Sequence, residues 1–340
     1  MRFAIDVMGG DHAPDAIVRG VVEALEDATD DDRFVLVGDR AVIEEILGEA
    51  GASDPRVSIE HAPQIISMSE SPVEAIKNKP DSSIVRMMRL GSARKTADPV
   101  DAVISAGNTG ACVSAANMEM RRLPGVHRPG IAVVLPTPNG PLVMCDVGAN
   151  PEPRPNHLAQ YGVMAEVYAR SVLGVSDPRI AQMNIGSEES KGTALVQEVR
   201  HLLRDNAHLN YVGFAEGRDL FEGVADVVVT DGFVGNTVLK LAEGLARSLF
   251  RAIATEVFEK DPELAMQLQP LLQGLIRQND YHEYGGAPLL GVNGVCLICH
   301  GSSEARTIRS AIRRARLYVR SGVNAAIVER LAELRTEPAS

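Results

Sequence analysis

The chain has 340 residues, 45% of them hydrophobic, with 30 glycines, 19 prolines, no tryptophan and a mean hydropathy of -0.02, a composition that excludes a disordered chain. The formal net charge of -11 argues against nucleic acid as the main partner, because phosphate backbones need a basic surface. No apolar run approaches the ~20 residues of a membrane-spanning helix, and four cysteines are too few for a disulfide framework, so we expect a cytoplasmic protein.

Short apolar, β-rich runs alternate with helical patterns along almost the whole chain. The first, FAIDV at 3–7, follows Met1 so closely that we expect no signal peptide. Strands that are apolar on both faces belong to sheets covered by helices on both sides. The sequence therefore predicts a doubly wound, mostly parallel α/β sheet in a single domain of one or two lobes over 1–335, with a frayed tail at 336–340. The other predicted strands are 34–38, 102–106, 132–136, 142–147, 180–185, 211–214 and 226–230.

Three of these runs lead straight into small, uncharged turns that each open a predicted helix. They are SAGNTGA at 105–111, DVGANPEP at 146–153 and TDGFVGN at 230–236. The first amides of a helix have no intrahelical partner, so a glycine-rich backbone lets an oxyanion approach them. Any one of these turns could be an ordinary connection, but three together favour a phosphate-handling pocket at the carboxyl ends of the strands.

Two further loops carry candidate site residues. DVMGGDHAP at 6–14 ends the first strand with two glycines, followed by Asp11 and His12, which could instead be a helix cap and an ordinary loop histidine. NIGSEESKG at 184–192 places Ser187 where it can cap a helix, with Lys191 one turn further on. A lysine there adds positive charge to the amide-rich end of a helix, unless it is a solvated surface lysine.

The run 236–257 predicts a long helix that is apolar almost all round, so we expect it at the centre of the molecule or in an interface. Asn236 and Lys240 share one side of its first turns, although Asn236 could be only an N-cap. A lysine on an apolar face is costly without a partner, which favours a site. One face of the helix is formed by Leu239, Ala242, Leu245, Ala246, Leu249 and Ile253.

The segment 258–280 departs from the alternation of strands and helices, and we interpret it as a helical tip. Apolar residues recur at helical spacing opposite several glutamines, and we expect Pro270 to split or kink the stretch. Two interpretations fit: a helical hairpin packed in a dimer interface or core, or an apolar tip that lies on a bilayer surface.

Cys296, Cys299 and His300 form a CxxCH string that formally matches a haem attachment pattern. Because GVCLICHG has the pattern of a buried strand and a lone CxxC is weak evidence for zinc, we interpret both cysteines as buried hydrophobic residues and expect no metal site. Neither a GxxxxGK[ST] loop, a GxGxxG fingerprint nor a GxSxG elbow is found. The predicted pocket therefore uses no mononucleotide loop, no dinucleotide cofactor and no covalent serine.

Six motifs in order resemble the PlsX family of phosphate acyltransferases, from Ile5 to about Arg320: DVMGGDHAP, SAGNTGA, DVGANPEP, NIGSEESKG, EGRDLFEGVADVVVTDGFVGN and YGGAPLLGVNGVCLICHGSS. The resemblance implies the fold of the phosphotransacetylase and isopropylmalate dehydrogenase group, with a protruding helical hairpin. It implies transfer of a fatty acyl group from acyl carrier protein to inorganic phosphate, giving acyl phosphate for phospholipid synthesis. It also implies a homodimer that visits the membrane surface, where a membrane-bound glycerol-3-phosphate acyltransferase uses the product. No cofactor is implied beyond the phosphopantetheine on the carrier protein.

By the same resemblance, Lys191 and Asn236 occupy the catalytic positions. We hypothesise that Lys191 and helix amides hold phosphate while Asn236 or a glycine amide donates to the oxyanion. Cys112 could be an acyl acceptor, but direct attack by phosphate is simpler and a buried structural cysteine is favoured. The positions that match the family's substrate-binding motifs are Asp6, Gly9, Gly10, Asp11, His12, Asn108, Thr109, Asp146, Asn150, Gly235 and Lys240.

Since acyl carrier proteins are acidic, we expect basic residues to dock them, and two clusters are candidates unless each is a solvated face. One is on a helix from Ser303 and contains Arg306, Arg309, Arg313, Arg314, Arg316 and Arg320; the other contains Arg86, Arg89, Arg94 and Lys95. Three other functions stay open at this point. They are a coenzyme A-dependent phosphotransacylase of the same fold, a non-catalytic phosphate or metabolite sensor, and a hydroxyacid dehydrogenase.

Overall fold

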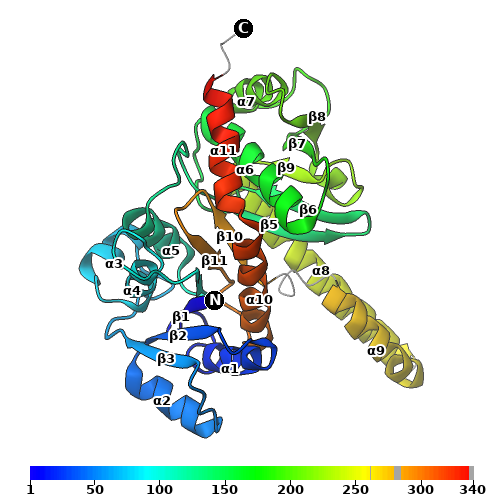
Figure 1. Ribbon diagram of the computed structural model, residues 1–340. Helices are drawn as coiled ribbons and strands as arrows, with labels where there is room; N and C mark the ends of the chain where they lie inside the picture. The colour runs from blue at the N-terminus through cyan, green and yellow to red at the C-terminus, as the bar shows by residue number, and fades with distance from the viewer. Residues whose placement is uncertain (261, 279–284, 337–340) are drawn as a thin grey trace.

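A computed structural model describes residues 1–260, 262–278 and 285–336 (Figure 1). In these residues eleven strands form one sheet in the order β3-β2-β1-β4-β11-β10-β5-β6-β9-β7-β8. The strands are β1 Arg2–Asp6, β2 Arg33–Gly38, β3 Val57–His61, β4 Ala102–Ser105, β5 Gly130–Thr137, β6 Gly140–Cys145, β7 Arg179–Met183, β8 Asn210–Ala215, β9 Val227–Val229, β10 Ala287–Leu290 and β11 Val295–Ile298.

Helices follow most of the strands. The α-helices are α1 Asp15–Ala24, α2 Arg40–Glu49, α3 Pro72–Asn78, α4 Ser83–Leu90, α5 Thr109–Ala115, α6 Pro155–Leu173, α7 Ala194–Arg204, α8 Gly232–Lys260, α9 Pro262–Gln278, α10 Ala305–Ser321 and α11 Val323–Thr336. Short 3-10 helices span Leu25–Asp27 (η1) and Gly217–Phe221 (η3), and a π-helical turn, η2, spans Ala116–Met120.

The sheet consists of two parallel blocks joined by an antiparallel centre. The strands β3, β2, β1, β4 and β11 are parallel to one another, and so are β6, β9, β7 and β8. Between the blocks, the pairs β11–β10, β10–β5 and β5–β6 are antiparallel. The mostly parallel, doubly wound sheet predicted from the sequence is confirmed, and the two blocks meet at β10 and β5.

Helices cover both faces of the sheet, because successive side chains of a strand point to opposite faces. In β1, Phe3 and Ile5 belong to one buried core, which is covered by α1, α2, α6, α7, α10 and α11. Ala4 belongs to the other core, which is covered by α3, α4 and α5. The alternation of two cores along one strand is why the strands are apolar on both faces.

Two strands were not predicted from the sequence. The strand β3 lies at the edge of the sheet and is only half-buried, so the segment VSIEH lacks the continuous apolar pattern of the others. The strand β10 has four residues and contains Pro288, which weakens its strand signal. The strand predicted within GVCLICHG is confirmed as β11, and Cys296 and Cys299 are buried as expected.

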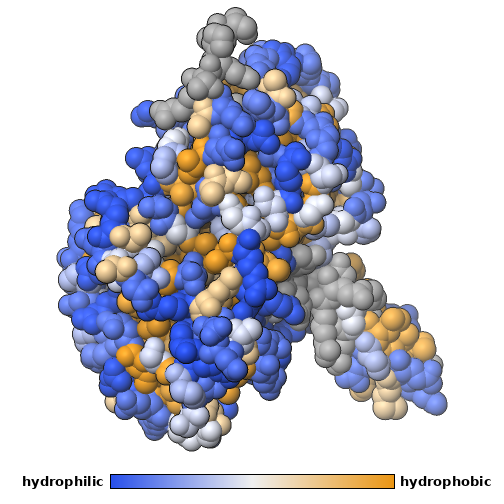
Figure 2. All heavy atoms as spheres, in the orientation of Figure 1, coloured by the Kyte–Doolittle hydropathy of each residue, from blue (hydrophilic) through white to orange (hydrophobic). Residues whose placement is uncertain are grey.

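The long helix α8 leaves the body of the molecule and pairs with α9 to form a protruding arm (Figure 1). The first alternative, a central helix, is wrong, because Gly232 and Gly235 alone are buried among the described residues of α8; the second, a helix in an interface, stays a prediction. Pro270 does not split the second helix, since α9 continues through it, and a kink there stays a prediction. Figure 2 shows hydrophobic residues towards the far end of the arm. Phe258, near the end of α8, and Met266, in the first turns of α9, are exposed. None of the described helices is both long and apolar enough to cross a membrane.

Candidate functional site

A cavity of about 480 Å³, which we call the central cavity, lies where the two blocks of the sheet meet. In one block its polar residues come from loops after β1, β4 and β11 and from Thr307 of α10, and in the other from the first turns of α8 after β9. Asp11, Thr109, Asn236 and Lys240 line it together, so the fold unites predicted site residues that are distant in the sequence. Its apolar wall is formed by Met68, Ile131, Val133, Val134, Val147, Leu239, Ala287 and Ile298.

The side chain of Asn236 is available to a ligand. It is half-buried one turn inside α8, so the alternative that it is the N-cap is wrong. The cap is Asp231, whose Oδ1 accepts hydrogen bonds from the amides of Phe233 and Val234 at 3.0 and 2.8 Å. Among the described residues, the side-chain amide of Asn236 has no hydrogen bond, and its Cβ and Cγ lie near the backbone of Gly148.

Lys240 also lines the cavity, one turn further along α8. It is exposed, so the expected cost of burying its charge on an apolar face does not arise. No ion pair of Lys240 occurs within the described ranges of the chain, which leaves its ammonium group free to neutralise an anion in the cavity.

The hypothesis that all three glycine-rich turns bind anions is wrong for two of them. In the turn after β6, the amides of Gly148, Ala149 and Asn150 donate to the carboxylate of Asp146 at 2.7 to 3.2 Å. In the turn after β9, the first amides of α8 are satisfied by Asp231 and by the backbone oxygen of Asn150. These amides are therefore not available to a phosphate.

The turn after β4 differs from the other two. Asn108 caps α5 through the amide of Ala111, at 3.0 Å, and its Nδ2 donates to the backbone oxygens of Ser67, Met68 and Glu70. In the described part of the chain, the amides of 108–110 have no protein acceptor, and Thr109 and Gly110 line the cavity. This turn therefore keeps the free amides that the sequence predicted, and Asn108 acts by holding the 67–70 loop beside it.

Asp6 and Asp146 are fully buried and do not line the central cavity. They accept hydrogen bonds from residues of the loops that surround it. Asp6 accepts a hydrogen bond from Ser105 Oγ at 2.7 Å and from the amide of Met8 at 3.1 Å. Burial raises the pKa of Asp6 and of Asp146, and the hydrogen bonds that each carboxyl accepts counteract part of that rise. Each carboxyl fixes the loop that follows its strand.

The predicted glycines allow close approach between loops. A Cβ on Gly9 would lie 2.5 Å from Asp6 Oδ2, and one on Gly235 would lie 2.0 Å from the backbone oxygen of Asp146. Gly10 has a φ of 116° and would place a Cβ 3.1 Å from the oxygen of Gly301. These glycines therefore shape the cavity through packing.

Lys191 and His12 are also absent from the lining of the central cavity. Lys191 is in the loop before α7, exposed, with its Nζ 3.8 Å from Glu188 Oε1. That helix begins at Ala194 and is capped by Thr193, so the expected cap at Ser187 is wrong. His12 is exposed and absent from the cavity lining. Because β7 and β9 are parallel neighbours, the loop of Lys191 leaves the same edge of the sheet as α8.

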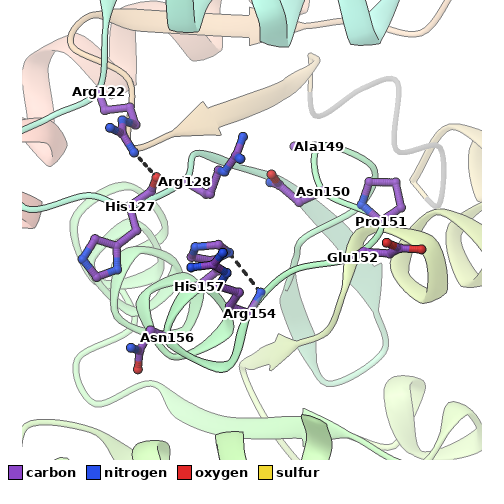
Figure 3. A pocket seen from close by; sticks show the side chains of 10 residues that line it. All are labelled: Arg122, His127, Arg128, Ala149, Asn150, Pro151, Glu152, Arg154, Asn156 and His157. Carbon is purple, nitrogen blue, oxygen red and sulfur yellow. Dashed lines mark hydrogen bonds between the residues drawn. The ribbon is translucent and has the colours of Figure 1, made fainter.

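Asn150 lines a second, open cavity of about 1020 Å³, which we call the basic pocket. Figure 3 shows its side chain beside those of Arg128, Arg154 and His157. Asn150 Nδ2 donates to the backbone oxygen of Pro129 at 2.7 Å, which ties the loop after β6 to the segment that carries Arg128. The sequence analysis missed this pocket, although RRLPGVHR at 121–128 is locally rich in basic residues.

His300 was also missed as a lining residue of the central cavity. Its Nδ1 is 2.8 Å from Ser302 Oγ, within the loop that follows β11. The sequence signal was the position of His300 directly after a buried strand, where we considered it only as part of a metal string. Among the described residues, no group of three or more His, Cys, Asp and Glu side chains is arranged to hold a metal ion.

Comparisons with known proteins agree with these observations. A family profile described as "Fatty acid synthesis protein" matches residues 1–326. The phosphate acyltransferase of Heliobacterium modesticaldum is 45% identical over 339 residues, covering 97% of this chain and 98% of that protein. The chain belongs to this family of phosphate acyltransferases. A second relative, from Dictyoglomus turgidum, is 41% identical over 337 residues and covers 98% of each chain.

Solved structures similar to this chain share its fold. A phosphotransacetylase from Streptococcus pyogenes has a TM-score of 0.59 at 17% identity, with 96% of this chain and 94% of that chain covered. The EutD phosphotransacetylase from Staphylococcus aureus has a TM-score of 0.57 at 14% identity, with 95% and 94% covered. The predicted phosphotransacetylase-like fold is confirmed.

The thiol of Cys112 is unsuited to act as a nucleophile. It is fully buried, and this burial raises the pKa of Cys112 to about 12, so a thiolate does not form near neutral pH. We therefore expect Cys112→Ala to keep acyl transfer to phosphate within about twofold of wild type, and steady-state rates with saturating phosphate measure this. A loss of activity without a loss of folded protein would make Cys112 an acyl acceptor.

Proposed function

We propose that this enzyme transfers a fatty acyl group from acyl carrier protein to inorganic phosphate in the central cavity. The observation that carries the proposal is the composition of that cavity, which combines a long apolar wall with Asn236, Thr109 and Lys240 at its polar side. An apolar wall suits an acyl chain, and free amides with a nearby ammonium group suit a phosphate. The family's activity as phosphate acyltransferases requires both ligands to meet.

The reaction is a direct displacement at the thioester carbon. One phosphate oxygen forms a bond to the carbonyl carbon, the carbonyl oxygen becomes an oxyanion, and the carbon–sulfur bond then breaks. The products are acyl phosphate and a thiolate, which takes up a proton from water. A substantial fraction of phosphate is the dianion near neutral pH, since by analogy with phosphoesters its second pKa is about 6 to 7, and the thiol has a pKa of about 8.5, so no strong base is needed.

The enzyme contributes positioning and charge stabilisation. In this proposal Asn236 donates its free side-chain amide to the developing oxyanion, while the amides of 108–110 and Lys240 hold the phosphate. Lys191 remains a proposed catalytic residue on the adjacent loop, and its long side chain must leave Glu188 to reach the phosphate. No cofactor is needed, because phosphopantetheine arrives on the carrier protein.

The exposed apolar arm supports two further parts of the proposal. Leu241 and Leu245 are 68% and 65% exposed on α8, at the spacing of successive helical turns. A second copy of the chain would cover this face in a homodimer. The apolar side chains near the end of the arm suit contact with a membrane surface, where a membrane-bound glycerol-3-phosphate acyltransferase would consume acyl phosphate for phospholipid synthesis.

An assay of acyl phosphate tests the proposed donor. Purified enzyme with inorganic phosphate is given long-chain acyl carrier protein or the matching acyl-coenzyme A, and acyl phosphate is trapped with hydroxylamine. We expect kcat/KM at least about tenfold higher with the carrier protein, because a protein donor adds contacts that a free thioester lacks. Equal or higher efficiency with coenzyme A would favour a coenzyme A-dependent phosphotransacylase, and phosphate binding without turnover would favour a sensor.

A further inference from the structure

The basic pocket gathers several cationic side chains at one place on the surface. Arg122, His127 and Arg128 come from the segment before β5, and Arg154 and His157 come from the start of α6 (Figure 3). All three arginines are exposed, and none has an ion pair within the residues that the structure describes. Glu152 is the one acidic residue among those lining the pocket, and in Figure 3 it lies on the side opposite Arg122.

The two basic clusters expected to dock the carrier protein differ from this pocket, because their own neighbours neutralise much of their charge. On α10, Arg309 pairs with Asp27 at 2.8 Å, and Arg316 pairs with buried Asp32 at 2.7 Å. In the second cluster, Arg86 contacts Glu60 and Asp81 at 3.1 Å, while Arg89 and Lys95 approach Glu119 at 3.4 and 3.7 Å. Charges that are already paired attract a partner weakly.

The pKa of His157 is affected by the positive charges around the pocket. Its pKa is lowered by partial burial and then by the nearby charges of Arg128, His127, Arg154 and Arg122. The Nδ1 of His157 accepts a hydrogen bond from the amide of Arg154 at 3.0 Å, which fixes both residues at the mouth of the pocket. Three arginines are therefore held together with no ion pair in the part of the chain that the structure describes, as in sites that bind an anionic partner.

A single loop separates this pocket from the central cavity. Val147 and Gly148 line the central cavity, and the next two residues, Ala149 and Asn150, line the basic pocket. The buried carboxylate of Asp146 holds this loop through four amide hydrogen bonds, counting that from Ile131. A donor anchored by negative charge in the basic pocket could therefore pass a flexible thiol-bearing arm over the loop to the reacting centre.

Resting on the proposed function, we propose that the basic pocket docks the acidic carrier protein of the acyl donor, with the phosphodiester that joins the carrier to its pantetheine arm seated among Arg122, Arg128 and Arg154. Arginine suits this role because its planar group donates two parallel hydrogen bonds to phosphate or carboxylate oxygens. The pocket acts in binding the donor, and the central cavity carries out the chemistry.

Single substitutions Arg128→Ala and Arg154→Ala test the proposal. Arg122 is left intact, because its guanidinium group also donates to the backbone of His127. We expect KM for acyl carrier protein to rise about five- to tenfold in each variant, with KM for phosphate unchanged and kcat at saturating donor within about twofold. The rise in KM shrinks at high salt, because screening weakens the same contacts in wild type. Melting temperatures equal to that of wild type verify folding.

Two controls separate docking from other roles. Arg94→Ala removes an exposed positive charge of the second cluster and leaves KM for the carrier unchanged. With S-acyl pantetheine, which carries no phosphate, wild type and both pocket variants react equally. Unchanged KM for the carrier, a rise in KM for phosphate, or slower reaction of the variants with S-acyl pantetheine would each overturn the proposal. Absence of wild-type turnover with the carrier protein would refute the proposed function itself.

Discussion

Asn236→Ala is expected to lower kcat for acyl transfer about 10²- to 10³-fold, with a small change in KM for either substrate. A preorganised donor to the developing oxyanion acts mainly in the transition state, so its loss lowers kcat and leaves ground-state binding nearly intact. The prediction depends on two structural facts: Asn236 lines the central cavity, and its side-chain amide has no hydrogen bond to any other described residue. Steady-state kinetics with both substrates varied measures it.

Thr237→Ala is the matched control. Thr237 is the next residue of α8, is exposed, and donates its hydroxyl to the backbone oxygen of Phe233 at 2.8 Å. It is absent from the cavity lining, so its loss should leave kcat within about twofold of wild type. If Asn236→Ala were as active as Thr237→Ala, Asn236 would have no role in stabilising the oxyanion.

Gly235→Ala is expected to have the largest structural effect of any single methyl group added to the site. The new Cβ would lie 2.0 Å from the backbone oxygen of Asp146 and 2.9 Å from Thr230 Cγ2. Backbone atoms cannot give way as a flexible side chain can, so α8 must move away from the loop after β6. We expect a loss of about 1–3 kcal/mol in the free energy of unfolding, and a loss of activity because Asn236 moves with the helix.

Gly244→Ala in the same helix separates this effect from helix propensity. A Cβ there meets no atom within 4 Å in the described structure, and alanine stabilises a helix interior by roughly 0.5–1 kcal/mol relative to glycine. Denaturant unfolding of both variants should therefore give changes of opposite sign. A stable and fully active Gly235→Ala variant would contradict the close approach of α8 to Asp146.

The sequence predicted the sheet well because its central strands are apolar on both faces. Phe3, Ala4 and Ile5 in β1 show why: alternate side chains enter two different cores, so the whole run is hydrophobic. The edge strand β3 has no such signal, since it is half-buried. The direction of the second parallel block, and its junction with the first through β10 and β5, depend on long-range pairing that no local pattern encodes.

The site was predictable only in part, for a physical reason. Thr109, Asn236 and Lys240 follow strands, and the sequence correctly associated them with one another. Which backbone amides remain free was not predictable. Asp146 and Asp231 accept hydrogen bonds from the amides of the loops that follow them, and this depends on side-chain geometry. The basic pocket joins two segments across the start of α6, and its lack of compensating acids is a property of the folded surface.

The position of helix α8 could be predicted only in part. Its apolar faces predicted a helix at the centre of the molecule or in an interface, and the structure places the helix in an exposed arm, which contradicts only the first alternative. An apolar pattern indicates that a surface is covered, but it does not identify what covers that surface.

A crystal structure with phosphate and an amide isostere of long-chain acyl pantetheine, in which nitrogen replaces the thioester sulfur, tests the central claim most directly. The account predicts the acyl chain along Ile131, Val133 and Leu239, phosphate at the free amides of 108–110, and the carbonyl oxygen about 3 Å from Asn236 Nδ2. An acyl chain bound elsewhere, with Asn236 and Thr109 both contacting only solvent, would contradict it.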